Sequence, residues 1–231
     1  MPHTPPPAST GAIVREVLRI YERYAVEVVE RFDFCPWAAR ARRDGAVDAR
    51  VLLAPNHEDF SASLAQIDAL SARAEVSVGL LIYPRFSSGR LDFEHFVRRL
   101  RQADAERHPP GEIPFAMAAF HPHAEPCIDD PERLIPFIRR SPDPTIQLVR
   151  QRVLEAVRGE ENAGTTVVDL WMLTPGGRTE TETLGLRERI SLANQKRLRE
   201  TGTAAVEAVL SDIAADRARS YARLGLPVGT R

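Results

Sequence analysis

The stretch VSVGLLIYP at residues 76–84 decides the fold. It is a nearly continuous apolar run, rich in β-branched and aliphatic residues, and it closes on Pro84. A short run of this kind between turn residues is typical of a strand that is buried on both faces of a sheet. Proline suits the exit of such a strand because it cannot donate a ladder hydrogen bond. The sequence therefore predicts a central strand here.

Two further runs, at residues 47–54 and 115–120, show the same strand-like character. Between the three runs lie helical patterns at residues 57–72 and 90–107. Strands that alternate with helices predict a parallel sheet with right-handed crossovers. We therefore expect an α/β fold with a parallel or mixed central sheet of three to four strands, flanking helices, and extra N- and C-terminal helices.

Apolar residues at three- and four-residue spacing predict the remaining helices. These helices are expected at residues 11–31, 36–43, 134–138, 145–158 and 186–224, the last with a break at Gly202. Residues 165–173 have the composition of an extra strand. The proposed organisation is a disordered tail at 1–10, a single domain at 11–224 with a probable insertion at 159–186, and a flexible tail at 225–231.

Composition narrows the classes of function. A net charge of −1 argues against a general binder of nucleic acid, and no stretch approaches the roughly 18 apolar residues of a membrane span. The N-terminal residues lack the basic start and apolar run of a secretory signal. Two cysteines in 231 residues make no disulfide framework and favour a reducing compartment. We therefore expect a cytoplasmic protein with no membrane partner.

The ends of the three predicted strands suggest where a ligand would bind. Each strand is followed by a proline, at Pro55, Pro84 and Pro122. In a parallel sheet these exits share one edge, and open α/β sheets bind ligands at that carboxyl edge. His121 ends the third strand. Cys35 precedes the helix that leads into the first strand, so it is expected on the same side of the molecule.

These positions lead to the first hypothesis, a thiol enzyme acting on a small anionic substrate. A thiol at a helix N-terminus is favoured as thiolate, the reactive form. Cys35 would be the nucleophile or redox centre, and His121 would be its base or the cation that holds the thiolate. Arg140 and Arg150 would bind the anion, and Ser141 would cap the following helix or add a donor. The alternative is a buried structural cysteine, with the arginines paired to Asp129, Asp130 or Glu132.

Two other classes of function remain open. The segment from His121 to Asp130 is dense in metal-ligand types, and a Cys35 thiolate could ligate haem, although the spacing fits no strong metal template and no metal ligand is assigned. A non-catalytic binding module could use the arginine-rich stretches at 40–43 and 98–101. Nucleic acid is an improbable partner, since aromatic residues make up only 6% of the chain. The cofactor and the oligomeric state are left unassigned.

Several motifs also resemble a known family. FDFCPWA at 32–38 is similar to its N-L-C-P-F-A motif, and AFHP at 119–122 is similar to S-F-H-P. RSPDPTIQLVR at 140–150 is similar to R-S-P-Y-P-x-L-H-L-L-R, and NQKRLRETG at 194–202 is similar to N-x-x-x-L-R-x-L-G. The chain thus resembles the uncharacterised bacterial family called domain of unknown function 1415, over about residues 15–202.

The resemblance implies no reaction, but it singles out matching positions. Among them are Cys35, His121, Arg140, Ser141, Arg150 and Asn194, and it adds Asn194 to the candidate substrate-binding residues. The chain departs from the family pattern at His123, Cys127 and Arg139, so these three residues gain nothing from the resemblance.

Overall fold

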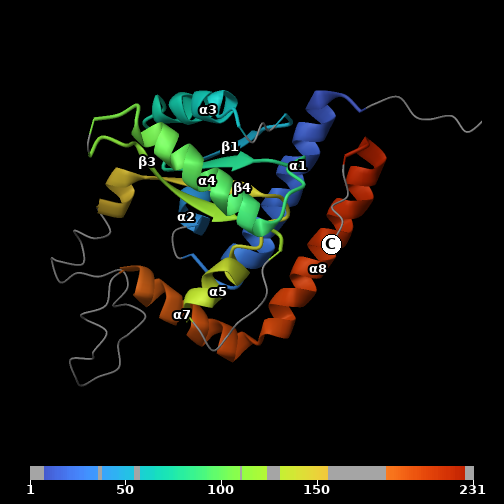
Figure 1. Ribbon diagram of the computed structural model, residues 1–231. Coiled ribbons are helices and arrows are strands. Elements are labelled where there is room, and N and C mark those ends of the chain that lie inside the picture. Colours follow the sequence, from blue (N-terminus) through green and yellow to red (C-terminus); the bar gives the residue numbers. More distant parts are fainter. Residues whose placement is uncertain are drawn as a thin grey trace, which may run out of the picture.

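A four-stranded sheet lies between two layers of helices (Figure 1). The structure is a computed structural model, and it describes residues 8–35, 38–54, 58–109, 111–123, 131–155 and 186–226. The strands are β1 (Val47–Val51), β2 (Val78–Ile82), β3 (Phe115–Phe120) and β4 (Thr145–Arg150), in the order β1-β2-β4-β3. The α/β fold with a mixed sheet of four strands is as expected from the sequence.

The pairing of the strands gives the sheet a defined carboxyl edge. β1 is parallel to β2, and β4 is antiparallel to both β2 and β3. It follows that β1, β2 and β3 all run in the same direction, with β4 inserted between β2 and β3. The three strand exits therefore share one edge, as the sequence predicts.

The prediction of a helix over residues 145–158 is wrong in its first half. Residues 145–150 form β4, and only residues 151–155 are helical within the described chain. Ile146 and Val149 fit a helical period, but Pro144 favours an extended chain before it. The strand also fills the space between β2 and β3 and pairs with both, and such tertiary pairing overrides weak local preference.

One face of the sheet is covered by α3 (Ser61–Ser71) and α4 (Arg90–Ala105). The core on this side is rich in aromatic rings, which come mainly from α4 and the end of β2. Helix α3 approaches β2 closely at Gly79, where an added Cβ would lie 2.9 Å from Leu70 Cδ1 and 3.2 Å from Leu148 Cδ1. A glycine is needed at this position because there is no room for a side chain.

The other face is covered by α1 (Thr10–Tyr24), α5 (Pro131–Ile138) and α8 (Thr203–Leu224), and α7 (Leu186–Thr201) packs against α5. The expected break at Gly202 is confirmed: its φ of 80° is a conformation that suits glycine, and it separates α7 from α8. Helices α1 and α8 lie side by side although they are about 200 residues apart in the chain (Figure 1).

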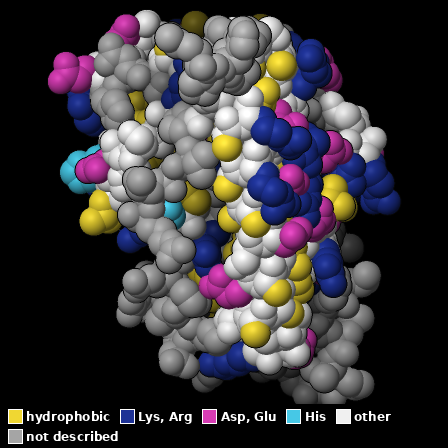
Figure 2. All heavy atoms as spheres, turned by 90° about the vertical axis from the view of Figure 1, so that its right-hand side faces the viewer, with side chains coloured by type: hydrophobic (Ala, Val, Ile, Leu, Met, Phe, Trp, Pro, Cys, Tyr) yellow, Lys and Arg dark blue, Asp and Glu magenta, His cyan; other side chains and the backbone are white. Residues whose placement is uncertain are grey.

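Ion pairs join α1 to α8 across the surface. Arg19 and Arg23 of α1 each contact Asp216 of α8, at 2.9 and 2.8 Å. Figure 2 shows acidic and basic side chains interleaved on this face. Hydrogen bonds from Arg19, and then from Arg23, hold the pKa of the Asp216 carboxyl at about 2. The contact between the terminal helices is therefore partly electrostatic.

Some expectations fall outside the described residues. The predicted strand at 165–173 and most of the predicted insertion at 159–186 are among them, as are most of both predicted tails. None of the helices that the structure describes has the length and apolarity that a membrane span requires.

Candidate functional site

His121 lies at the carboxyl edge of the sheet, directly after β3. Its side chain is buried, with 4% of the residue exposed, and its backbone N–H donates to the carbonyl of Arg139 at 3.1 Å. The segment that enters β4 therefore lies beside the end of β3. This contact brings the sequence-predicted His121 and the Arg139–Arg140 segment together.

Both ring nitrogens of His121 have backbone partners. The N–H of His123 donates to Nδ1 at 3.2 Å, and Nε2 lies 3.3 Å from the carbonyl oxygen of Ser88. Because Nδ1 accepts, the neutral ring carries its proton on Nε2 and donates it to Ser88. Burial lowers the pKa of His121 to about 4, and the nearby His123 and Arg90 contribute in the same direction. The ring is therefore neutral near pH 7.

Cys35 follows a stretch of unusual backbone. Helix α1 continues into the π-helix η1 (Ala25–Glu30), and the N–H of Phe34 donates to the carbonyl of Val29 at 2.9 Å, five residues back. Asp33 then has a φ of 52°, in the left-handed region that residues with a Cβ rarely adopt. π-Helical turns and left-handed non-glycine residues cluster at functional sites.

Helix α7 anchors this segment from the other side. Asn194 is 2% exposed, and its Nδ2 donates to the carbonyl of Phe34 at 3.3 Å. Arg197 forms an ion pair of 2.5 Å with Asp33. Asn194, which was expected to bind substrate, thus contacts the backbone next to Cys35. Half-buried Cys35 sits at the end of a segment that two residues of α7 hold.

The helix that follows Cys35 is short. α2 (Ala38–Arg43) has six residues, and the carbonyl of Cys35 accepts from the N–H of Ala38 at 3.1 Å. Pro36, where this helix is expected to begin, is outside the described residues. A six-residue helix is a weak basis for activating a thiol, so any stabilisation of a thiolate must be sought in nearby charges.

The hydroxyl of Tyr24 links the helix that leads to Cys35 with the segment that carries the two arginines. Tyr24 is buried in α1, and its Oη donates to the carbonyl of Ile138 at 2.9 Å. Burial, followed by the neighbouring Tyr21, raises its pKa well above the usual value; an ionised Cys35 would add to the rise, and the positive charges of Arg139 and Arg140 oppose it. The hydrogen bond to Ile138 also places this hydroxyl beside the segment that carries the two arginines.

Tyr21 lies near the same thiol. Burial, followed by the negative charge of Cys35, raises the pKa of its hydroxyl. The two tyrosine rings are in edge-to-face contact, with centroids 5.7 Å apart. Both tyrosines lie in the helix expected at residues 11–31, and the sequence patterns assigned neither of them a functional role. The sequence feature that could have identified them is a pair of tyrosines three residues apart on the helix that leads to Cys35.

Among the described residues, Arg140 pairs with one acid and remains accessible. Its Nη1 lies 2.6 Å from Oε1 of Glu207 on α8, and its Nε donates to the carbonyl of Pro122 at 3.3 Å. About a fifth of its side chain, 22%, is exposed. The acid found is Glu207. Of the expected partners, Asp129 and Asp130 lie outside the described residues, as does the side chain of Glu132.

Ser141 is fully buried, and its Oγ donates to the carbonyl of Asp143 at 2.5 Å. No helix follows for it to cap, since the chain enters β4. Asp143 is itself buried and bound by Arg217 at 2.7 Å and by the hydroxyl of Tyr221 at 2.6 Å, both from α8. The Ser141 hydroxyl thus serves the loop that docks β4 against α8.

Arg150 lies at the opposite edge of the sheet. It pairs with Phe115 at the start of β3, whereas Thr145 pairs with Phe120 next to His121. Its guanidinium donates to the carbonyls that end α3 and precede β2; these acceptors are Leu70 at 3.2 Å, Arg73 at 2.8 Å and Val76 at 2.7 Å. The structure does not bring Arg150 together with Cys35, His121 and Arg140.

The metal hypothesis is not tested by this geometry. Glu125, Cys127, Asp129 and Asp130 lie outside the described residues. In the part of the chain that the structure describes, no three His, Cys, Asp or Glu side chains form a group that could hold a metal ion. The backbone contact at Nδ1 also occupies one of the two nitrogens that His121 could offer.

Comparison with known proteins gives one family. Residues 16–168, more than half of the 231-residue chain, match the family described as protein of unknown function (DUF1415). This range contains Cys35, His121, Arg140 and Arg150, while Asn194 lies beyond it. No curated protein and no solved structure matches the chain. With that share of its length matched and with the motifs around Cys35, His121 and Arg140 inside the match, the chain belongs to the DUF1415 family.

Proposed function

We propose that the carboxyl edge of the sheet holds an enzymatic site in which Cys35 reacts as a thiolate with a small anionic substrate. The observation that carries the proposal is the hydrogen bond from Oη of Tyr24 to the carbonyl of Ile138, because it joins the helix that leads to Cys35 to the segment that carries Arg139 and Arg140. Positive charge near a thiol favours its ionised form, and a guanidinium also suits a carboxylate or phosphate group. One pair of arginines would therefore serve both the nucleophile and the substrate.

The backbone around Cys35 supports this proposal. A left-handed Asp33 costs about 1 kcal/mol or more and persists only where surrounding contacts enforce it. Here Asn194 and Arg197 of α7 supply those contacts. A purely structural cysteine needs no such arrangement. We assign Asn194 the role of a positioning residue for the Cys35 segment.

His121 takes a different role from the one that its spacing suggests. A general base needs an available lone pair and a pKa near the working pH. The Nδ1 lone pair of His121 already accepts from His123, and its pKa is about 4. We therefore propose that His121 positions the Ser88 and Arg139 segments around the site. Direct pairing of His121 with Cys35 stays a prediction that would require release of the His123 contact.

Arg140 is the residue that we propose to bind the substrate anion. Its Glu207 partner comes from α8, and the two side chains are 22% and 34% exposed. Solvent screens a partly exposed ion pair of this kind, so one anion can exchange for another. A substrate carboxylate or phosphate would displace Glu207 and bring its reactive carbon toward Cys35. A thiol in this role fits a reducing compartment, and we propose a cytoplasmic location.

The test compares alkylation of Cys35 by iodoacetamide and by iodoacetate, read by peptide mass spectrometry over a range of pH. Cys127 in the same chain is the internal reference. We expect Cys35 to react with an apparent pKa below about 8.5, the ordinary value for cysteine. We also expect iodoacetate, a small anion, to react faster relative to iodoacetamide at Cys35 than at Cys127.

Two variants sharpen the test. Arg140→Gln should lower the iodoacetate preference and raise the apparent pKa of Cys35. Arg42→Gln removes the same charge from exposed α2, where Arg42 pairs with Glu30 at 2.7 Å, and should change neither. Alkylation of Cys35 only after unfolding, or an anion preference that survives Arg140→Gln, would contradict the proposal.

A further inference from the structure

Strand β1 is an edge of the sheet. Within the described residues it pairs only with β2. The N–H of Leu52 donates to the carbonyl of Ile82 at 2.9 Å, and the carbonyl of Ala46 accepts from Val78 at 3.1 Å. Because backbone groups alternate in direction along a strand, the even-numbered residues face β2. The N–H and C=O groups of Val47, Ala49 and Val51 therefore point away from the sheet.

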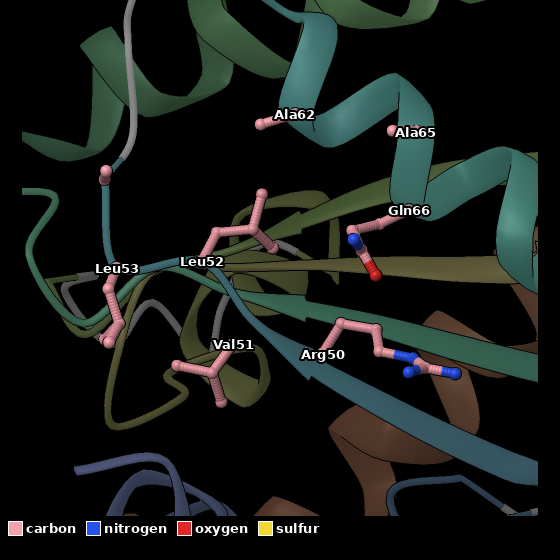
Figure 3. Close-up of a pocket in the computed structure, with 8 residues that line it drawn as sticks. Arg50, Val51, Leu52, Leu53, Ala62, Ala65 and Gln66 are labelled. Atoms are coloured by element: carbon pink, nitrogen blue, oxygen red, sulfur yellow. The ribbon is translucent and has the colours of Figure 1, made fainter. Parts of the chain in front are cut away.

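A hollow of about 410 Å³ lies above this edge, between β1 and α3. Its walls are the end of β1, with Arg50 and Leu52, and the small or polar residues Ala62, Ala65 and Gln66 of α3. Figure 3 shows Leu52 pointing from β1 toward α3 and Gln66 pointing from α3 toward the sheet. Helix α3 packs over β2 at Gly79, and among the described residues no strand pairs with the outer side of β1.

The side chains on the α3 face of β1 carry opposite charges. Nη2 of Arg50 lies 2.8 Å from Oδ2 of Asp48, and Arg73 contacts the same oxygen. The Nε of Arg50 is buried and has no hydrogen-bond acceptor in the described chain. A buried donor without an acceptor is costly. The edge therefore offers both an unfilled donor and a carboxylate, two residues apart.

We propose that a second copy of this chain pairs with β1 in antiparallel fashion, with Ala49 on the two-fold axis. This register sets Val47 opposite Val51 of the partner subunit and Asp48 opposite Arg50 of the partner subunit. Every charged residue of the strand VDARV then meets its opposite charge, twice by symmetry. The Asp48 carboxylate of each subunit then faces the partly exposed guanidinium of Arg50 across the axis.

The hydrogen-bonding pattern selects the same register. In an antiparallel pair, hydrogen-bonded residues exchange two bonds, and they alternate with pairs whose side chains lie closer together. With Ala49 on the axis, the outward groups of Val47, Ala49 and Val51 form the hydrogen-bonded pairs. Asp48 and Arg50 form the closer pairs, where opposite charges interact best. The result is a continuous eight-stranded sheet with helices on both faces.

Charge on an edge strand usually discourages pairing with other chains. Charged residues discourage such pairing when they come opposite a like charge or opposite an apolar surface. In VDARV the two charges are opposite and symmetric about a small residue, so self-pairing brings attraction at both positions. This symmetry is why the occupant proposed for the edge is a second copy and not an unrelated peptide.

The test measures the mass of the full-length chain in solution by sedimentation velocity over a range of concentration. We expect the wild-type chain to approach twice its 25.7 kDa. Ala49→Pro removes an N–H that points away from β2, so it should yield a monomer with an unchanged circular dichroism spectrum. Asp48→Arg and Arg50→Asp should each weaken the dimer by about tenfold or more, since each creates two like-charge pairs.

The double variant Asp48→Arg/Arg50→Asp decides the question of register. It restores opposite charges across the axis and should recover the dimer that each single change loses. A wild-type chain that stays monomeric at its highest attainable concentration overturns the proposal. So does a dimer that Ala49→Pro leaves intact, or single-variant losses that the double variant does not recover, because the interface would then lie elsewhere or use another register.

Discussion

Arg140 and Arg150 lie ten residues apart and at opposite edges of the same sheet. Both were expected to bind an anion. At the carboxyl edge Arg140 pairs, within the described part of the chain, with the half-buried Glu207 and stays accessible. At the other edge Arg150 donates to the carbonyls of Leu70, Arg73 and Val76 and stacks over the ring of Phe115 at 4.8 Å. The acceptors around a guanidinium, rather than the residue type, decide whether it serves binding or folding.

The largest effect that separates the two edges is on stability. Arg150→Met should lower the free energy of unfolding by about 4 kcal/mol, because several half-buried carbonyls lose a charged donor. Arg140→Met should cost less than about 1 kcal/mol, as for other partly exposed ion pairs. Chemical denaturation monitored by circular dichroism measures both.

Arg150→Lys is the matched control. It keeps the charge but lacks the planar fork that reaches several carbonyls at once, so it should recover only part of the loss. Equal costs for Arg140→Met and Arg150→Met would show that the two edges do not differ in this way.

The next effect concerns pH at the carboxyl edge. An unfolded histidine has a pKa near 6.5, and burial lowers that of folded His121 to about 4. Above pH 6.5 both states are neutral and the contribution of His121 is fully present. Between about pH 6.5 and pH 4 the unfolded state binds a proton that the folded state does not bind. The free energy of unfolding therefore falls by up to about 3 kcal/mol as the pH is lowered.

The variant His121→Gln should flatten this part of the pH profile, and His95→Gln, at an exposed position of α4, should leave it unchanged. Carboxyl groups titrate in the same range, so the difference between each variant and the wild type is the quantity to compare. A profile for His121→Gln that runs parallel to the wild type would mean that the ring is not held neutral.

A smaller effect tests whether the Tyr24 hydroxyl influences the thiol of Cys35. Tyr24→Phe leaves the carbonyl of Ile138 without its donor and should cost about 1.5 kcal/mol of stability. It should also change the apparent pKa of Cys35 in the alkylation assay, because a hydroxyl near the thiol is lost. Tyr221→Phe also removes a buried hydroxyl, but one bound to Asp143, and should leave Cys35 unaffected. If the apparent pKa of Cys35 were the same in Tyr24→Phe as in the wild type, the Tyr24 hydroxyl would have no influence on the thiol.

The sequence predicts the sheet better than the site. Continuous apolar runs and the prolines after them mark β2 and β3 and one shared edge for their exits. The sequence did not identify β4 because Ile146 and Val149 fit a helical period while Ile146 and Leu148 fit a strand period, and only its pairing with two neighbours selects the strand. The motif around Arg140 and Arg150 could not reveal that six residues of extended chain, β4, carry the second arginine to the far edge.

The candidate site depended on features that leave no trace in residue spacing. His121 reaches the predicted edge, but which backbone groups occupy its nitrogens depends on the loops that carry Ser88 and His123. The left-handed Asp33 likewise lies where the segment after η1 contacts α7, which lies more than 150 residues along the chain. Sequence patterns locate chemistry-bearing residues on an edge, while their protonation and orientation come from tertiary contacts.

The smallest effect examines the strain beside Cys35. Asp33→Gly, Asp33→Asn and Asp33→Ala all remove the ion pair with Arg197, which is worth about 0.5 kcal/mol at this exposure. Alanine must also hold a φ of 52° with a Cβ and with no polar side chain to compensate, so it should be less stable than glycine by about 1 kcal/mol. Asparagine, which tolerates this conformation, should fall between them. If alanine matches glycine in stability while Cys35 alkylation slows in alanine alone, the segment has relaxed to an ordinary φ, and the left-handed turn is what presents the thiol.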